Sequence, residues 1–218
     1  ELICEQNHSP FSDLQDFQQR CGLRQDQRQK LAAAGAFSCF GEHRYQSQWQ
    51  SLALDHKGPL FENSVAEDLN DGIHLSEARP MDSLNLDYRH TGLTLGPHPM
   101  SLLRAEIAEL KSCLRSSDLS QLGHRRFARV AGLVTGRQRP GTASGVVFLT
   151  LEDETGNSNI VVWKSVQERC REALLRGKLL IVKGVVETEQ KVTHLIAGEL
   201  IDCSHYLQDT RLTSRDFH

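Results

Sequence analysis

Apolar and polar side chains alternate from Phe127 onward, and this period of two is typical of half-buried β-strands. Turn-forming residues at Pro140-Gly141 and from Asp153 to Gly156 interrupt the alternation, as expected between strands. Helical spacing over 165–174 predicts one amphipathic helix within the region. The alternation predicts strands over residues 130–139, 146–152, 159–163, 178–187 and 192–200.

Three strands, a helix and two further strands are, in that order, the arrangement of an OB-fold, a five-stranded β-barrel. We therefore expect an OB-fold over 124–205, followed by a C-terminal tail over 206–218. Within the second strand, Val147, Leu149 and Leu151 should fill the barrel, because successive side chains on a strand point to opposite faces.

The first part of the chain carries apolar positions at helical spacing instead. The pattern predicts a compact helical module over 1–55, whose first helix begins with Ser9 as its N-cap and Pro10 in its first turn. The two remaining helices of the module are expected over 26–34 and 42–54.

Between this module and the barrel, residues 56–82 lack periodicity and are acidic, which predicts a linker. Residues 83–123 are expected to form a helical connector, with helices over 82–90 and 99–114. The predicted fold class is therefore an α+β multidomain chain: a helical module, an acidic linker with short helices, and an OB-fold barrel.

Charge changes this picture only locally. The formal net charge of the 218 residues is −3, so binding to nucleic acid has to come from local basic patches. One such patch is visible, because the stretch from Leu119 to Leu151 holds five arginines and no acid. The stretch from Glu62 to Asp82 holds six acids and one base, which indicates a different role for the linker.

The chemistry-bearing residue types form no recognisable catalytic or metal motif. The six cysteines include no C-x-x-C pair, and the histidines show no metal-ligand spacing, so no metal or cofactor is expected. Reduced thiols and the lack of an apolar run of membrane length favour a cytoplasmic protein. Glu152-Asp153-Glu154 resembles a magnesium-binding cluster, but its place at a strand end before Gly156 favours a structural turn.

The second and third strands carry the candidates for contact with bases. Phe148, Asn159 and Trp163 should point outward on the face where OB-folds bind nucleic acid strands. Outward aromatic rings beside arginines suit a base-stacking platform. A second interpretation stays open, in which another part of the protein covers these rings.

Basic residues supply the candidates for phosphate contact. Arg129, Arg137 and Arg139 lie on or beside the first strand, and the last two lead into the loop at Pro140-Gly141. Phosphate binding is the favoured interpretation, and a solvated charged strand edge is the alternative.

A second phosphate site is conceivable in the helical module, where Gly35 lies between two predicted helices with Arg28 and Lys30 upstream. Backbone N–H groups of a glycine hairpin can bind a phosphate. The motif alone favours an ordinary helix-ending glycine.

Three stretches of the chain together resemble a known family. They are Arg129 through Gly156, Asp87 to Met100, and the ending Ser214 to His218. In combination they resemble the C-terminal part of the error-prone bacterial C-family DNA polymerases, paralogues of the replicative α subunit that act in damage-induced mutagenesis and translesion synthesis.

The resemblance implies that 1–55 is a helix-hairpin-helix module on duplex DNA, with its hairpin at 30–37, and that the OB-fold lies near single-stranded template. The stretch from Phe148 to Gly156 is also similar to tRNA anticodon-binding OB-folds, in which the Phe148 position stacks on a base. An RNA-binding role is therefore a further alternative. The catalytic aspartates of such a polymerase would precede Glu1, so this segment is expected to be non-catalytic.

The resemblance also concerns protein partners. Replicative relatives carry a sliding-clamp motif, and the matching segment here keeps Leu60 and Phe61 but lacks the leading Gln, which argues against direct clamp contact. A mutasome partner of Y-family-like type is expected instead, docking on the tail residues Arg215, Asp216, Phe217 and His218. The alternative function is accordingly a protein-interaction module with little DNA affinity of its own.

Overall fold

The structure, a computed structural model, describes residues 10–41, 43–53, 73–141, 145–189 and 192–207. The chain divides into two compact units, Glu1–Leu93 and Thr94–His218. The boundary falls inside 83–123, the range expected to be a connector. Most of the expected linker, up to residue 72, lies outside the described residues.

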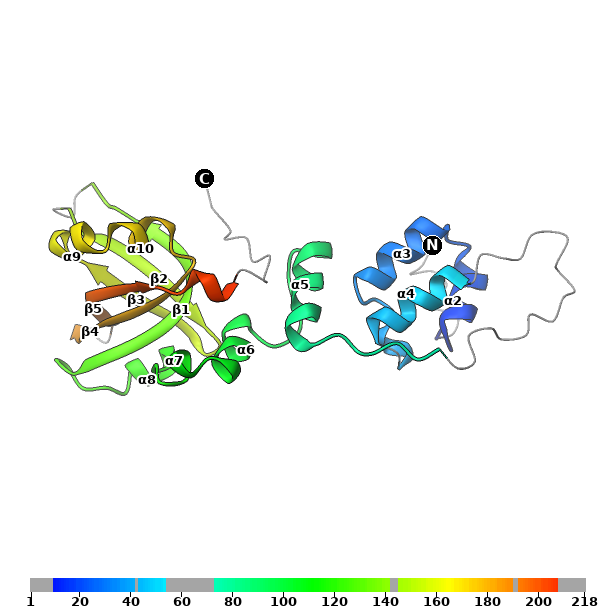
Figure 1. Cartoon of the computed structure of the whole chain (residues 1–218), viewed down its shortest axis with the longest axis horizontal. Helices are drawn as coiled ribbons and strands as arrows, with labels where there is room; N and C mark the ends of the chain where they lie inside the picture. The colour runs from blue at the N-terminus through cyan, green and yellow to red at the C-terminus, as the bar shows by residue number, and fades with distance from the viewer. Residues whose placement is uncertain (1–9, 42, 54–72, 142–144, 190–191, 208–218) are drawn as a thin grey trace, which may run out of the picture. The chain divides into compact units, whose positions relative to one another are not determined.

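Short helices build the first unit, drawn from blue to blue-green in Figure 1. The first helix begins later than expected, because Asp13 and not Ser9 provides the N-cap: its carboxylate accepts the N–H of Asp16 at 2.8 Å. Pro10 therefore lies before the helix. The helices are α2 (Leu14–Cys21), α3 (Gln25–Ala33), the 3₁₀ turn η1 (Ser38–Phe40), α4 (Arg44–Ala53) and α5 (Pro80–His90).

Aromatic packing and an ion pair between α4 and α5 help to stabilise this unit. Phe17 of α2 packs edge-on against Phe37, with ring centroids 5.2 Å apart, in a core that also contains Leu14 and Ala32. The guanidinium of Arg44 pairs with the carboxylate of Asp87 and so joins α4 to α5. Because both side chains are largely buried, this pair is better shielded from solvent than a surface ion pair.

A closed five-stranded barrel forms the second unit, in the strand order β1-β2-β3-β5-β4. The pairing of β3 with β5 is parallel, and the other pairings are antiparallel. The predicted OB-fold is thereby confirmed. The strands are β1 (Phe127–Gln138), β2 (Val147–Asp153), β3 (Gly156–Val162), β4 (Leu179–Glu189) and β5 (Val192–Asp202).

Helices cover the barrel on two opposite sides (Figure 1). The helix expected over 165–174 is two helices, α9 (Lys164–Arg169) and α10 (Arg171–Arg176), separated at Cys170. The helix expected over 99–114 also breaks, at Ile107, whose backbone is extended with φ −101° and ψ 114°. The resulting elements are α6 (Pro99–Glu106), α7 (Ala108–Lys111) and α8 (Ser116–Leu119), and the 3₁₀ turn η2 (Ser204–Leu207) follows β5.

A buried arginine explains the break at Ile107. The side chain of Arg104 donates to the carbonyl oxygens of Leu110 and Cys113, at 2.8 and 2.9 Å, which requires α7 to fold back over α6. The same guanidinium donates to the Glu154 carboxylate at 2.9 Å. Arg104 therefore joins α6 and α7 to the turn between β2 and β3.

The acidic turn is used in the same way. One carboxylate oxygen of Asp153 accepts the N–H of Ser116 at 2.7 Å, and the other accepts the N–H of Thr155 at 2.8 Å. Glu154 also lies 3.3 Å from the guanidinium of Arg115. These contacts support the structural interpretation of the turn, because Asp153 and Glu154 are bound by arginines and backbone N–H groups.

Candidate nucleic-acid interface

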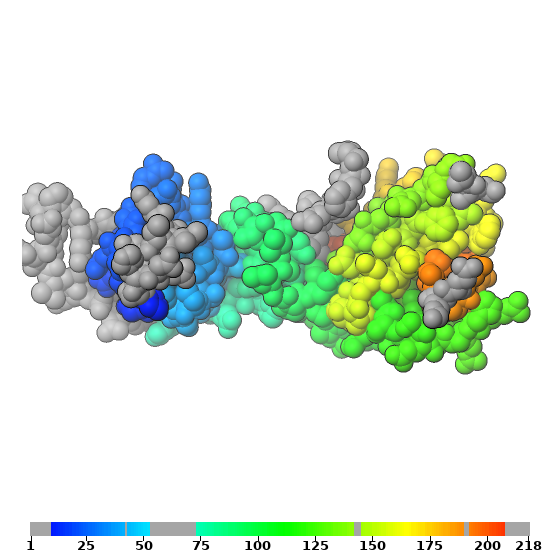
Figure 2. Space-filling model, turned by 180° about the vertical axis from the view of Figure 1, so that it is seen from behind, coloured from blue at the N-terminus to red at the C-terminus, as the bar shows by residue number. Residues whose placement is uncertain are grey.

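The outer face of β2 and β3 shows the alternation expected from the sequence. Leu149 and Leu151 are 1% exposed inside the barrel, whereas Phe148 and Thr150 point to the other face. On β3, Ile160 is buried in the core and Asn159 is exposed. Figure 2 shows the yellow-green and yellow atoms of this region as a continuous surface, open to solvent in that view.

An apolar row crosses this face. Phe148 of β2 pairs in register with Val161 of β3, and Val161 pairs with Ile196 of β5. Val161 alternates with the buried Ile160 and Val162 and so points outward, but only 9% of it is exposed. The half-buried Phe148 and Ile196 lie on either side of it, so the three side chains form a flat apolar strip, here called the stacking row.

A polar row lies beside the stacking row. Thr150 pairs in register with Asn159, and Asn159 pairs with His194. The Nδ1 atom of His194 is buried and has no hydrogen-bond partner among the described residues. Hydroxyl, amide and imidazole groups next to an apolar strip suit ligands that have flat apolar faces and polar edges, as nucleic-acid bases do.

Sequence reasoning missed His194 and Ile196, although both lie on this face. Their signal was present, since they alternate with the buried Leu195 and Ala197 along β5. What the sequence alone lacked was the parallel pairing of β5 with β3, which brings them beside Asn159 and Val161. Trp163, which the sequence did single out, follows β3 directly and is 51% exposed.

The predicted arginines do not gather on this face. Arg137 donates through Nε to the carbonyl oxygen of Leu174 at 2.9 Å, and through a second nitrogen to the carbonyl oxygen of Gly177. Arg129 pairs in register with Lys183 of β4, and its Nη1 donates to Ser112 Oγ at 3.1 Å. Of the three, Arg139 alone is exposed and forms no side-chain hydrogen bond or ion pair with another described residue.

The helical module requires a correction for Arg28. Its side chain is 2% exposed and donates to the carbonyl oxygen of Leu23 at 2.6 Å, so it supports the interior of the unit and does not face a phosphate. Its neighbour Lys30 is exposed. Because the helix α3 is polar at most positions, its buried side could not be identified from the sequence.

Gly35 has the backbone of a helix-ending glycine. Its φ is +76°, and its N–H donates to the carbonyl oxygen of Ala32 at 2.9 Å, while the N–H of Ala36 donates to Leu31 at 3.0 Å. A Cβ at this position would lie 2.9 Å from Nη2 of Arg44. The glycine therefore permits α3 and α4 to approach, and its own N–H is already used within the turn.

The remaining predicted partner-binding residues, Leu60, Phe61, Arg215, Asp216, Phe217 and His218, lie outside the described residues. Within the described part of the chain, no helix is long and apolar enough to cross a membrane. The same part contains no group of three or more histidine, cysteine or acidic side chains placed to hold a metal ion.

Two family models match the chain. Residues 128–202 match the OB-fold nucleic acid binding domain, and residues 1–47 match the helix-hairpin-helix motif. The first match covers the barrel almost completely, and the second covers α2, α3 and the turn that leads into α4. Both units therefore belong to domain types named for their folds, and the barrel belongs to one also named for nucleic-acid binding.

The relatives are similar over the whole chain. An error-prone DNA polymerase of Saccharophagus degradans is 46% identical over 217 residues, which is 100% of this chain and 21% of that protein. The error-prone DNA polymerase of Idiomarina loihiensis is 48% identical over 200 residues, 91% of this chain and 19% of that protein. Among solved structures, asparaginyl-tRNA synthetase from Pyrococcus horikoshii matches with 24% identity and a TM-score of 0.37, over 42% of this chain and 23% of that one.

The chain thus spans about a fifth of the length of the curated relatives that it matches. The chain belongs to the error-prone DNA polymerase family as one segment of such a protein, built from a helix-hairpin-helix module and an OB-fold barrel.

Proposed function

We propose that this chain is a non-catalytic, DNA-binding part of an error-prone DNA polymerase, with its barrel on single-stranded template and its helical module on duplex DNA. The polymerase would act in the cytoplasm, in translesion synthesis during damage-induced mutagenesis. The proposal assigns neither a catalytic residue nor a cofactor to this segment.

The stacking row carries the proposal for the barrel. Phe148, Val161 and Ile196 offer a flat apolar strip, and Thr150, Asn159 and His194 offer polar groups along its side. An aromatic side chain that stacks on a base contributes about 1–3 kcal/mol to single-strand binding. One aromatic ring in the strip supports modest affinity with little preference for sequence.

The proposal for the helical module rests on its motif and on Lys30. The helix-hairpin-helix match covers the turn around Gly35, and the exposed Lys30 lies five positions before that glycine. Lys30 is therefore the proposed phosphate contact of this unit, and the buried Arg28 is not.

A specific observation favours a second candidate function, docking of a mutasome partner of Y-family-like type. The stacking row continues through Val185, which pairs with Ile196, to Phe127, and these side chains are 40% and 67% exposed. Exposed apolar side chains on several neighbouring strands are typical of protein contacts. In this alternative the tail residues 215–218 strengthen docking, and direct contact with the sliding clamp is not expected.

A titration by fluorescence anisotropy tests the proposed function. The chain is added to a labelled oligothymidine and, separately, to a labelled hairpin duplex at several salt concentrations. DNA binding predicts saturable binding whose log K falls linearly with log salt, because released counterions drive phosphate contact. Absence of binding to either DNA at low salt would exclude the proposal and leave partner docking.

A further inference from the structure

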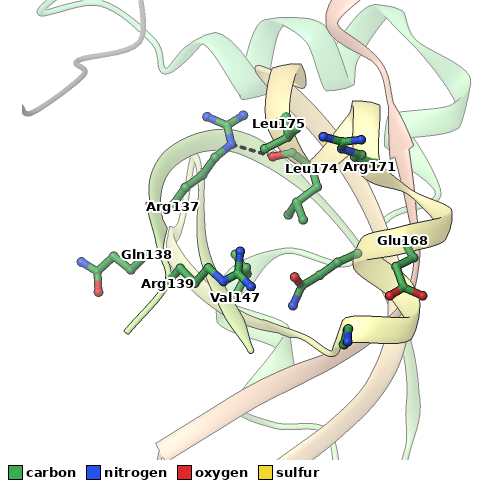
Figure 3. Close-up of a pocket in the computed structure, with 10 residues that line it drawn as sticks. Arg137, Gln138, Arg139, Val147, Glu168, Arg171, Leu174 and Leu175 are labelled. Carbon is green, nitrogen blue, oxygen red and sulfur yellow. Dashed lines mark hydrogen bonds between the residues drawn. The ribbon is translucent and has the colours of Figure 1, made fainter. Parts of the chain in front are cut away.

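A hollow with a volume of about 510 Å³ lies between the barrel and the helices α9 and α10 (Figure 3). The end of β1, the start of β2 and one side of both helices line it. Its volume falls within the range of about 300–1,000 Å³ that is usual for small-molecule sites. It is therefore large enough for a ligand of the size of a nucleotide.

Cations surround this hollow. Arg139, Lys164 and Arg171 line it, and among the described residues none of the three forms an ion pair or a side-chain hydrogen bond. Glu168 is the one acid among its described lining residues. Arg137 also lines the hollow, but its guanidinium is bound to the end of α10. Three cations without partners therefore create a positive potential there.

Apolar side chains form part of the same lining. Val147 of β2 and Leu174 of α10 lie on facing sides in Figure 3, and Leu175 lies next to Leu174. Leu175 is 61% exposed, although it belongs to a helix packed on the barrel. Unpaired cations beside exposed apolar side chains suit a ligand that joins an anionic group to an apolar body.

We infer that this hollow binds one nucleotide of a single-stranded nucleic acid, with Arg139, Lys164 and Arg171 contacting phosphate and Val147 and Leu175 contacting the sugar or base. The inference rests on the proposed function, because the ligand belongs to the strand that the stacking row binds. It assigns that strand a second contact region, on helices outside the face of β2 and β3.

The connection between the two regions is one residue long. Val147 lines the hollow, and its neighbour Phe148 belongs to the stacking row. The two side chains therefore point to opposite sides of β2 at the start of this strand. A single-stranded nucleic acid that contacts Phe148 can therefore pass the beginning of β2 and continue into the hollow, with no gap between the two contact regions.

An acidic peptide is the alternative ligand. Its glutamate side chains offer carboxylates to the cations but no flat apolar body. A nucleotide offers both a phosphate for Arg139, Lys164 and Arg171 and a sugar and base for Val147 and Leu175. The apolar part of the lining therefore favours the nucleotide.

Methyl resonances of isotopically labelled leucine and valine in the full 218-residue chain provide the test. The probes are a thymidine dinucleotide with a 5′-phosphate and a hexapeptide of glutamate. The inference predicts that the dinucleotide shifts the Val147, Leu174 and Leu175 methyl signals and that the peptide does not. Lys164→Gln combined with Arg171→Gln should abolish these shifts, whereas Arg176→Gln, an exposed cation of α10 outside the hollow, should preserve them.

Longer DNA gives a second readout. The double variant should reduce the slope of log K against log salt by about 1.4 for an oligothymidine, because each single-strand phosphate contact contributes about 0.7. Methyl shifts by the peptide alone, or no shift by either probe, would overturn the inference. If Phe148→Ala leaves DNA binding unchanged while the double variant weakens it, the stacking row does not bind DNA but the hollow does. If Phe148→Ala weakens binding while the double variant leaves it unchanged, the inference about the hollow is refuted and the proposed function is retained.

Discussion

Arg137 donates a hydrogen bond through Nε to the carbonyl oxygen of Leu174, at 2.9 Å, and so joins the end of β1 to the last turn of α10. Another of its nitrogens donates to the carbonyl oxygen of Gly177, the residue that follows this helix. Carbonyl groups at a helix C-terminus lack partners within the helix and carry a partial negative charge, which a guanidinium satisfies well. The principal role of Arg137 is therefore to fix α10 on the barrel.

Replacing Arg137 should consequently affect stability more than binding. We expect Arg137→Ala to lower the free energy of unfolding of the barrel by about 1.5–2 kcal/mol, the lower part of the range for charge-assisted hydrogen bonds, because the side chain is partly solvated. Arg139→Ala is the matched control, with little expected change in stability. Urea unfolding followed by the fluorescence of Trp163, in a Trp49→Phe background, measures both; equal stability of the two variants would contradict the assigned role.

Arg137 also shows where prediction from sequence stops. The positions of the five strands along the chain and the inward and outward faces of β2 followed from local alternation, which needs no knowledge of distant residues. The partners of Arg137 lie 37 and 40 positions further along the chain, so no local pattern could distinguish a helix-capping arginine from a phosphate-binding one. The same limit applies to Arg104, which breaks the expected helix at Ile107 through contacts that only the folded chain brings together.

The buried carboxylate of Asp153 predicts a pH dependence of stability. Burial raises the pKa of this group, but hydrogen bonds from Thr155 and Ser116 outweigh it, so the pKa lies below its ordinary value of 3.8. A depressed pKa in the folded state stabilises the protein above pH 3.8, and this contribution is lost as the pH falls through the folded-state pKa.

The comparison with Asp153→Asn isolates this contribution from those of other acids. At pH 7 the variant should be less stable than the original chain, since its amide cannot accept all the hydrogen bonds that the carboxylate accepts. The difference in free energy of unfolding should shrink as the pH falls below 3.8 and through the folded-state pKa, because the original carboxylate then becomes protonated too. Urea unfolding of both chains at a series of pH values measures this difference. A difference that does not change with pH would refute the depressed pKa of Asp153.

The two neighbouring cations of α3 should behave differently. Lys30→Ala should leave stability unchanged and lower the slope of log K against log salt for duplex DNA by about 0.9, the contribution of one phosphate contact. Arg28→Ala should instead reduce the stability of the helical unit by about 1.5–3 kcal/mol, because a buried charge-assisted hydrogen bond is lost. Trp49 fluorescence measures unfolding, and anisotropy measures binding. If Arg28→Ala stays fully folded and lowers the salt slope, Arg28 contacts DNA after all.

Phe148 provides the most direct test of the stacking row. The side chain is half-buried, and Phe148 pairs in register with Val161 of β3. Phe148→Ala should therefore cost less stability than the approximately 3–5 kcal/mol expected for a fully buried phenylalanine. Loss of a stacked base should weaken binding of an oligothymidine by about 1–3 kcal/mol, with an unchanged salt slope because no phosphate contact is removed.

Phe127→Ala is the matched control for this substitution, since Phe127 is 67% exposed at the far end of the same apolar series, on β1. It should leave DNA binding unchanged if the bases stack on Phe148 alone. If the apolar series serves partner docking, both variants should weaken binding of the partner and neither should change DNA affinity. The two substitutions remove the same type of side chain from opposite ends of one apolar series. An equal loss of DNA affinity in both variants would therefore show a general disturbance of the barrel surface and would exclude stacking at Phe148.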